Sequence, residues 1–271
     1  MKVKDVLRYV MVAIVTLVVL FPIYWMVITS LKPYVEIYSI PPVFFPLNIE
    51  NNYYRPFVKD VYFKYLLNSV IIALGNVALV IPSALLAAYG FSRFKVRRSE
   101  DIYFWALTCR MAPPAAFIVP LYIIYTRTGL FDTHLGLMLL YCLFNLPLAT
   151  WTLKGAIDAI PKDLDDAALV DGCGTLSTLR RVIIPLLGPS LAATAILVFV
   201  FAFNEYLFAS VLTATNARTI TSGLSAFITV VGIEWGEMAA VGTVCLIPTI
   251  IAAVLVQKYI VAGLTLGAVK G

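Results

Sequence analysis

Charged side chains are scarce in this sequence: its 271 residues include 20 basic and 15 acidic ones, together 13%. Hydrophobic residues make up 61% of the chain, and the mean hydropathy is +0.93. One soluble core of this length cannot bury so much apolar surface, so the composition predicts an integral membrane protein. In a membrane protein, the basic residues behind the net charge of +5 set the orientation of the chain in the membrane. They do not form a basic solvated domain, so no nucleic acid partner is expected.

Cysteine and histidine are also scarce, and the glycine pattern that binds phosphates is missing. Four cysteines are scattered without Cys-x-x-Cys spacing, which indicates small apolar residues. The single histidine, His134, has no second histidine or carboxylate pair at metal-ligand spacing, so no metal site is expected. No Gly-x-x-x-x-Gly-Lys-Ser/Thr sequence occurs, so we expect no ATP and no other cofactor to bind this chain.

Long apolar runs dominate instead, and a helix of about 20 apolar residues crosses the hydrocarbon core of a membrane. The predicted spans are 9–31, 66–90, 102–125, 135–152, 189–212 and 239–258. The short loop 91–101 carries four basic residues, which is typical of a cytoplasmic loop. We therefore predict an all-α integral membrane protein with six transmembrane helices in a single domain, 1–271, and both termini in the cytoplasm.

Four polar residues inside the predicted spans are candidates for a translocation pathway, because buried polar groups are costly in lipid. The candidates are Arg110, Asn145, Asn204 and Glu205. Arg110 precedes Pro113 and Pro114, which remove backbone donors and interrupt the helix. Two simpler roles stay open: Arg110 snorkels or pairs with a neighbouring subunit, and Glu205 pairs with Arg110 or with another subunit.

The longest charged, turn-forming block lies between the fourth and fifth spans, in the loop 154–185. Acidic residues at its start favour a helix over 163–170, and Gly172 supplies a turn. Thr175 or Ser177 can cap a second helix that stops before Pro185. The block predicts a cytoplasmic helix-turn-helix elbow, 163–185.

This elbow resembles the EAA loop of binding-protein-dependent ABC importers, whose pattern is Glu-Ala-Ala-x-x-Asp-Gly-Ala, a variable stretch and a proline. The residues that match are Asp166, Ala167, Ala168, Asp171, Gly172 and Pro185. Asp166 replaces the usual glutamate, Cys173 a small alanine, and Leu179 an often aromatic residue. The segment 30–33 (Ser-Leu-Lys-Pro) and the tail 263–271 also resemble permeases of carbohydrate importers of the maltose/trehalose type.

The resemblance implies a permease subunit with the type I ABC importer fold, and not an enzyme. Such a subunit moves a sugar, polyol or related carbohydrate from an external solute-binding protein across the cytoplasmic (inner) membrane of a bacterium or archaeon. The implied partners are a second homologous permease and two ATPase subunits, which hold the ATP and magnesium. The elbow residues would couple this chain to the ATPase, and the outer segment 213–238 would reach toward the binding protein.

Two other functions remain open. An ion-driven secondary carrier would use membrane carboxylates, and Glu205 is the only acid in a predicted span. An importer permease for a non-sugar solute, such as a sugar phosphate, is compatible with Arg110. A membrane enzyme is disfavoured, because no pair of acids or cluster of histidines is evident.

Overall fold

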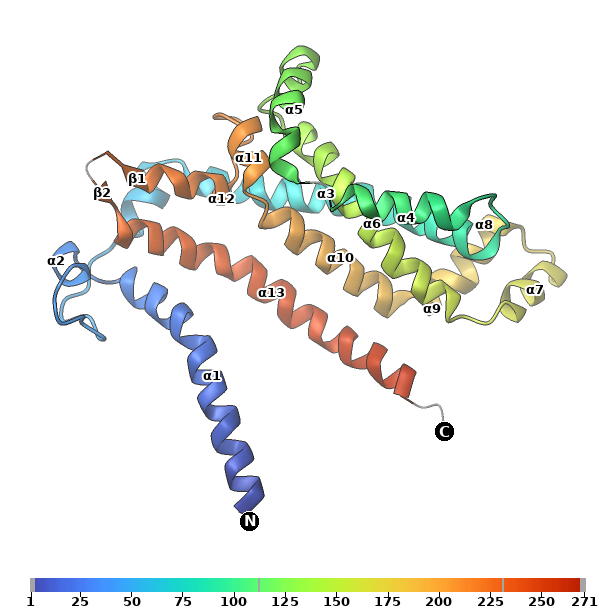
Figure 1. Cartoon of the computed structure of the whole chain (residues 1–271), viewed down its shortest axis with the longest axis horizontal. Helices are drawn as coiled ribbons and strands as arrows, with labels where there is room; N and C mark the ends of the chain where they lie inside the picture. The colour runs from blue at the N-terminus through green and yellow to red at the C-terminus, as the bar shows by residue number, and fades with distance from the viewer. Residues whose placement is uncertain (1–2, 112, 231, 269–271) are drawn as a thin grey trace. The chain divides into compact units, whose positions relative to one another are not determined.

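The structure is a computed structural model that describes residues 3–111, 113–230 and 232–268. It is built of helices with one short hairpin (Figure 1). Up to the fourth predicted span, the elements are α1 (Val3–Thr29), α2 (Tyr34–Ile37), η1 (Arg55–Lys59), α3 (Tyr62–Arg93), α4 (Ser99–Cys109), α5 (Pro114–Thr128) and α6 (His134–Asp158). The later elements are α7 (Asp163–Val170), α8 (Thr175–Thr178), η2 (Leu179–Ile183), α9 (Ile184–Leu186), α10 (Gly188–Phe203), α11 (Leu207–Leu212), α12 (Ile220–Gly223), η3 (Leu224–Phe227), β1 (Ile228–Thr229), β2 (Gly232–Ile233) and α13 (Trp235–Ala268).

The chain divides into two compact units. The first comprises Met1–Leu66 and Gly223–Ile247, and the second comprises Leu67–Ser222 and Pro248–Gly271. The first unit therefore holds α1, α2, η1, the hairpin and the first part of α13. The second holds most of α3 and the helices from α4 to α11.

The interior of the second unit is a packed core of α3, α6 and α10. Ala84 and Ala88 of α3 are 0% exposed, and their small side chains let a neighbouring helix approach closely. Leu179 and Ile183 of η2 are buried in the same core. The end of the predicted elbow is therefore fixed to the helices that are expected to cross the membrane.

Within the residues that the structure describes, four helices are long and apolar enough to cross a membrane: Leu7–Thr29, Tyr62–Arg93, His134–Asp158 and Trp235–Gln257. They include most of the first, second, fourth and sixth predicted spans. A fifth candidate is the pair Thr175–Leu186 and Gly188–Phe203, which is bent by 82°.

The ranges predicted as the third and fifth spans each contain a break. In 102–125, α4 ends at Cys109 and α5 begins at Pro114, because Pro113 is extended and neither proline offers an N–H. In 189–212, α10 ends at Phe203 and α11 begins at Leu207. The first break follows the sequence prediction. The second was not predicted, since the sequence around it is apolar on both sides.

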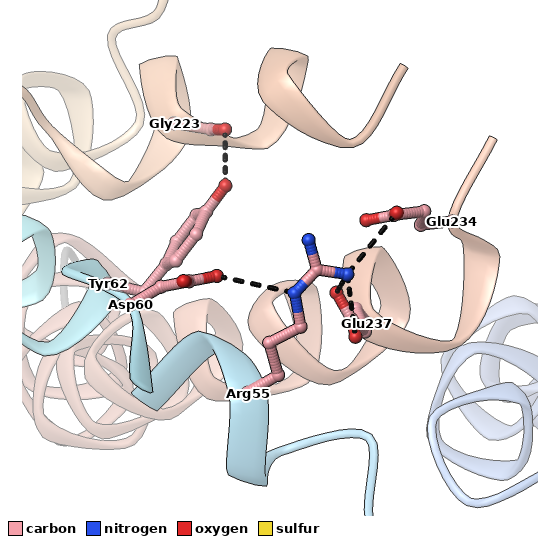
Figure 2. Close-up of polar contacts among 6 residues, drawn as sticks. All are labelled: Arg55, Asp60, Tyr62, Gly223, Glu234 and Glu237. Carbon is pink, nitrogen blue, oxygen red and sulfur yellow. Dashed lines mark hydrogen bonds and ion pairs between the residues drawn. The ribbon is translucent and has the colours of Figure 1, made fainter. Parts of the chain in front are cut away.

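In the first unit, η1 is joined to the start of α13 by a cluster of charges (Figure 2). The Nη1 atom of Arg55 lies 3.3 Å from Oε1 of Glu234 and 3.3 Å from Oε2 of Glu237. Its Nε atom lies 3.8 Å from Oδ2 of Asp60. In the same unit, β1 and β2 pair as a short antiparallel hairpin that the sequence did not predict.

Candidate functional site

The first half of the elbow is a capped helix. The α7 helix spans Asp163–Val170, as predicted, and Gly172 follows with φ +81°. The Gly172 N–H donates to Leu169 O (3.0 Å), and the Cys173 N–H donates to Ala168 O (2.9 Å). This pair of bonds is a Schellman motif, which needs a left-handed residue at the position of Gly172. The elbow therefore turns at one defined glycine.

The second half of the elbow differs from the prediction. Gly174, not Thr175 or Ser177, is the N-cap of α8, and no side chain caps this helix. The chain then continues through the π-helix η2 into α9, so the helical segment does not stop before Pro185. Pro185 lies in the first turn of α9, where the missing N–H costs little. The sharp change of direction comes at Leu187, between α9 and α10.

Asp165, which was not singled out from the sequence, anchors the elbow. Its Oδ1 accepts a hydrogen bond from the Tyr89 hydroxyl (2.9 Å), and its Oδ2 accepts one from Arg93 Nε (2.9 Å). Arg93 Nη2 also donates to Ile160 O at 2.9 Å. Asp166, the residue that matches the importer pattern, is exposed instead. The two acids therefore have different roles, one inside the protein and one on its surface.

The outer face of the elbow combines the matched residues with exposed apolar side chains. Of the matched residues, Ala168 is buried, whereas Asp166, Ala167, Asp171, Gly172 and Pro185 are exposed. Val170 is 88% exposed, and Leu169 and Leu176 are each more than half exposed. A group of exposed apolar side chains on a polar loop is typical of a protein interaction surface.

A cavity of about 270 Å³ lies in the second unit and contains three of the four pathway candidates. It is lined by Arg110, Pro114, Tyr141, Phe144, Asn145, Phe201, Glu205, Leu207 and Phe208. The Arg110 guanidinium carbon lies 4.9 Å from the centre of the Phe201 ring, in cation–π contact. The Nη1 atom of Arg110 is buried and has no hydrogen-bond partner among the described residues. The cavity thus presents aromatic rings and one uncommitted cationic donor.

Glu205 lies at the break between α10 and α11 and uses both carboxylate oxygens. Oε1 accepts from the Phe208 N–H (2.9 Å), and Oε2 accepts from the Ala209 N–H (3.0 Å) and the Tyr141 hydroxyl (2.9 Å). The carboxylate therefore satisfies the first donors of α11, which explains the break. Glu205 and Arg110 line one cavity but form no ion pair in the described part of the chain.

The two asparagine candidates lie in different places. Asn145 donates to Asn76 Oδ1 (2.8 Å), which joins α6 to α3, and it also lines the cavity. Asn204 donates to Val200 O in its own helix (2.9 Å) and is not among the cavity-lining residues. Among the residues described, no three His, Cys, Asp or Glu side chains are placed to hold a metal ion.

Asp132, between α5 and α6, holds the loop that follows α11. Its carboxylate accepts hydrogen bonds from four consecutive backbone N–H groups, those of Ala214, Thr215, Asn216 and Ala217. Burial raises the pKa of the Asp132 carboxyl, but the four hydrogen bonds lower it by more. The net result is a pKa of about 2. The positive φ of 55° at Asp132 aims the carboxylate at the loop, a geometry that sequence spacing does not reveal.

Comparison with known proteins identifies the family of this chain. The family model described as "binding-protein-dependent transport system inner membrane component" matches residues 80–266. The trehalose/maltose transport system permease protein of Thermococcus litoralis is 36% identical over 99% of this chain and 98% of its own length. The trehalose transport system permease protein of Mycobacterium tuberculosis is 38% identical over 93% of each chain. The diacetylchitobiose uptake system permease protein of Streptomyces coelicolor is 33% identical over 93% of this chain and 92% of its own.

The fold agrees as well. A chain of a bacterial ABC transporter that imports the acidic polysaccharide alginate superposes with a TM-score of 0.77 at 22% identity, covering 95% of this chain and 96% of that one. The resemblance deduced from the elbow and the tail is thereby confirmed, and the protein is a multi-pass membrane permease rather than an ion-driven carrier. This chain belongs to the family of binding-protein-dependent transport system inner membrane components.

Proposed function

We propose that this chain is the permease subunit of an ATP-driven ABC importer that carries a sugar, polyol or related carbohydrate into the cytoplasm. The observation that carries the proposal is the structure of the elbow. Its first helix ends in a Schellman motif, its surface exposes apolar side chains, and its end is buried in the core of α3, α6 and α10. The relatives named as trehalose, maltose and diacetylchitobiose permeases support carbohydrate as the substrate class.

In this proposal, the exposed face of the elbow docks on an ATPase subunit that holds the ATP and magnesium. Asp166, Ala167 and Asp171 lie on that face, beside the exposed apolar side chains. Leu179 and Ile183 then transmit the movement of the ATPase to α3, α6 and α10, because rigid packed helices move together. ATP hydrolysis takes place on the partner, so this chain is not an enzyme.

We further propose a type I importer architecture for the whole chain. In this architecture, residues 1–271 form one transmembrane domain that crosses the membrane six times. The third crossing consists of α4 and α5, and the fifth consists of α10 and α11. Both termini lie in the cytoplasm. The complex includes a second homologous permease, two ATPase subunits and an external solute-binding protein. A solved alginate transporter bound to a periplasmic protein supports the last partner.

The cavity around Arg110 is the proposed contribution of this chain to the translocation pathway. Arg110, Asn145 and Glu205 line it, and Asn204 remains a candidate outside it. Aromatic rings with a few planar polar groups are suited to a sugar ring. The unpartnered Nη1 atom of Arg110 favours an anionic solute, such as a sugar phosphate, as the second candidate substrate.

Reconstitution tests the proposal. The chain is placed in vesicles with its partner permease, ATPase and binding protein, and uptake of labelled trehalose, maltose and diacetylchitobiose is measured. We expect uptake that requires ATP, the ATPase and the binding protein. Uptake that persists without the ATPase, or that follows an ion gradient alone, would overturn it.

A further inference from the structure

The first unit contains a groove of about 700 Å³, and none of its lining residues lines the cavity around Arg110. It is lined by Phe21, Pro22, Trp25, Met26, Thr29, Lys32, Ile37, Tyr38, Leu224, Trp235, Met238, Ala239 and Gly242. Most of these side chains are apolar, and Lys32 is the one cation among them. Lys32 belongs to the segment 30–33, which resembles the corresponding segment of carbohydrate importer permeases.

Lys32 is buried and forms no direct ion pair with the described residues. The residue is 1% exposed, and its Nζ atom lies 4.0 Å from the centre of the Trp25 ring. Its ammonium group makes no hydrogen bond or ion pair with any residue that the structure describes. The nearby Glu36 carboxylate instead accepts from the N–H groups of Leu47 (3.0 Å) and Asn48 (3.1 Å). The Lys32 Nζ atom therefore has no direct acceptor in the described part of the chain, and an anionic ligand would supply one.

The burial of Lys32 also changes the pKa of its ammonium group. Burial lowers the pKa of the Lys32 ammonium group, and attraction to Glu36 opposes this effect. An anionic ligand beside the ammonium group would favour its charged form further.

The backbone around Lys32 is fixed in advance. The Asn52 side chain donates to Ser30 O (3.1 Å) and to Lys32 O (2.9 Å). The Glu50 N–H donates to Leu31 O at 2.9 Å. A Cβ atom at Gly236 would lie only 2.8 Å from the Asn52 side chain, so the start of α13 packs tightly against it. The site is therefore built before any ligand arrives.

The groove lining changes from apolar to polar toward the C-terminal end of α1. Phe21, Trp25 and Met26 form the apolar part, and Thr29 and Lys32 follow at the C-terminal end of the helix. With a rise of 1.5 Å per residue, the stretch from Phe21 to Thr29 covers about 12 Å. Trp25, Tyr38 and Trp235 are residue types typical of the membrane interface. This order of apolar wall, aromatic belt and cation matches the order of acyl chain and headgroup in a lipid.

We propose that this groove is a binding site for a phospholipid with an anionic headgroup, in the leaflet at the C-terminal end of α1. The lipid phosphate pairs with the Lys32 ammonium group, and an acyl chain lies against the α1 wall from Phe21 to Met26. Charge complementarity selects a phosphate-bearing lipid, since Lys32 is the one charged residue among the described residues that line the groove. The site does not depend on which solute the protein carries.

Lipid retention tests the proposal. The full complex is purified from bilayers that contain phosphatidylglycerol and phosphatidylcholine, and bound lipid is counted by native mass spectrometry. We expect phosphatidylglycerol to be retained by the wild type and by Lys32→Arg, and retention to fall on the order of tenfold in Lys32→Gln. Lys59→Gln is the matched control, because Lys59 also lies over a ring, that of Tyr54 at 5.5 Å, but is exposed.

Retention that is equal in the wild type and Lys32→Gln, or equal for the two lipids, would overturn the proposal. A second measurement does not require a substitution at Lys32. A photoreactive residue at Ile37, which lines the groove, is activated in the membrane-embedded complex. An adduct with the mass of phosphatidylglycerol supports the lipid site. An adduct with a polypeptide shows that a partner chain fills the groove and overturns it.

Discussion

Arg93 at the end of α3 donates from Nε to Oδ2 of Asp165 in the elbow at 2.9 Å, and their side chains are 7% and 12% exposed. This ion pair joins the C-terminal end of α3 to the first helix of the elbow. A movement of the elbow therefore acts on α3 through a short, charge-assisted hydrogen bond. The pair makes the elbow part of the membrane domain rather than a loose loop.

Removing the charge of Asp165 is expected to destabilise the protein. In Asp165→Asn, the buried Arg93 loses its anionic partner, and the free energy of unfolding should fall by about 3 kcal/mol. Asp166→Asn, one residue along the same helix but exposed, should change it by less than about 0.5 kcal/mol. Thermal unfolding of the detergent-solubilised complexes checks this. Equal melting temperatures for the two variants would show that the ion pair does not stabilise the elbow.

Asp132 should make stability depend on pH only in strongly acidic solution. Its pKa falls from 3.8 to about 2 on folding, so its contribution is complete above pH 4 and is lost as the pH falls toward 2. Because the carboxylate is partly exposed, we expect this contribution to be about 1 kcal/mol.

The control for this prediction is Asp132→Asn, which accommodates the positive φ but has no charge. Unfolding curves at several pH values should show a gap between wild type and variant that is constant from pH 7 to pH 5. The gap should close as the pH approaches 2. A gap that stays open in acid would assign the effect to the loop geometry and not to the charge.

Arg110 should matter for transport more than for stability. Its Nη1 atom has no hydrogen-bond partner among the residues that the structure describes, so Arg110→Leu should give up chiefly the contact with Phe201, about 0.5–1 kcal/mol. If a solute uses this donor, uptake should fall about tenfold. Arg127→Leu, an exposed arginine of α5 outside the cavity lining, should leave uptake close to that of the wild type. Initial uptake rates at matched protein levels measure both, and a wild-type rate in Arg110→Leu would remove Arg110 from the pathway.

Sequence reasoning located the elbow because its signals are local. The first helix starts among acidic residues and ends at Val170, just before the turn at Gly172, and both ends follow from helix capping alone. The break before Pro114 was likewise predicted, since proline has no N–H to donate. The exposed and buried acids, Asp166 and Asp165, were not told apart. That distinction depends on which face of α7 meets Arg93, and the partner lies far away in the sequence.

The features that were missed all depend on long-range contacts. The helical segment continues through η2 and α9 beyond Pro185, and Leu179 and Ile183 of η2 are buried in the core. The break at Glu205 exists because its carboxylate caps α11 and meets Tyr141 of α6. Neither follows from hydropathy, which does not report contacts between residues that are far apart in the sequence.

The most direct test of the account is ATP hydrolysis by the reconstituted complex, stimulated by the binding protein and sugar, in the wild type, Gly172→Pro and Gly174→Ala. Proline cannot adopt the φ of +81° at Gly172, whereas Gly174 has φ −76°, which alanine accepts. We predict that Gly172→Pro loses stimulation and uptake while remaining inserted in the membrane, and that Gly174→Ala retains both. Full stimulation in Gly172→Pro would contradict the claim that this elbow couples the chain to its ATPase.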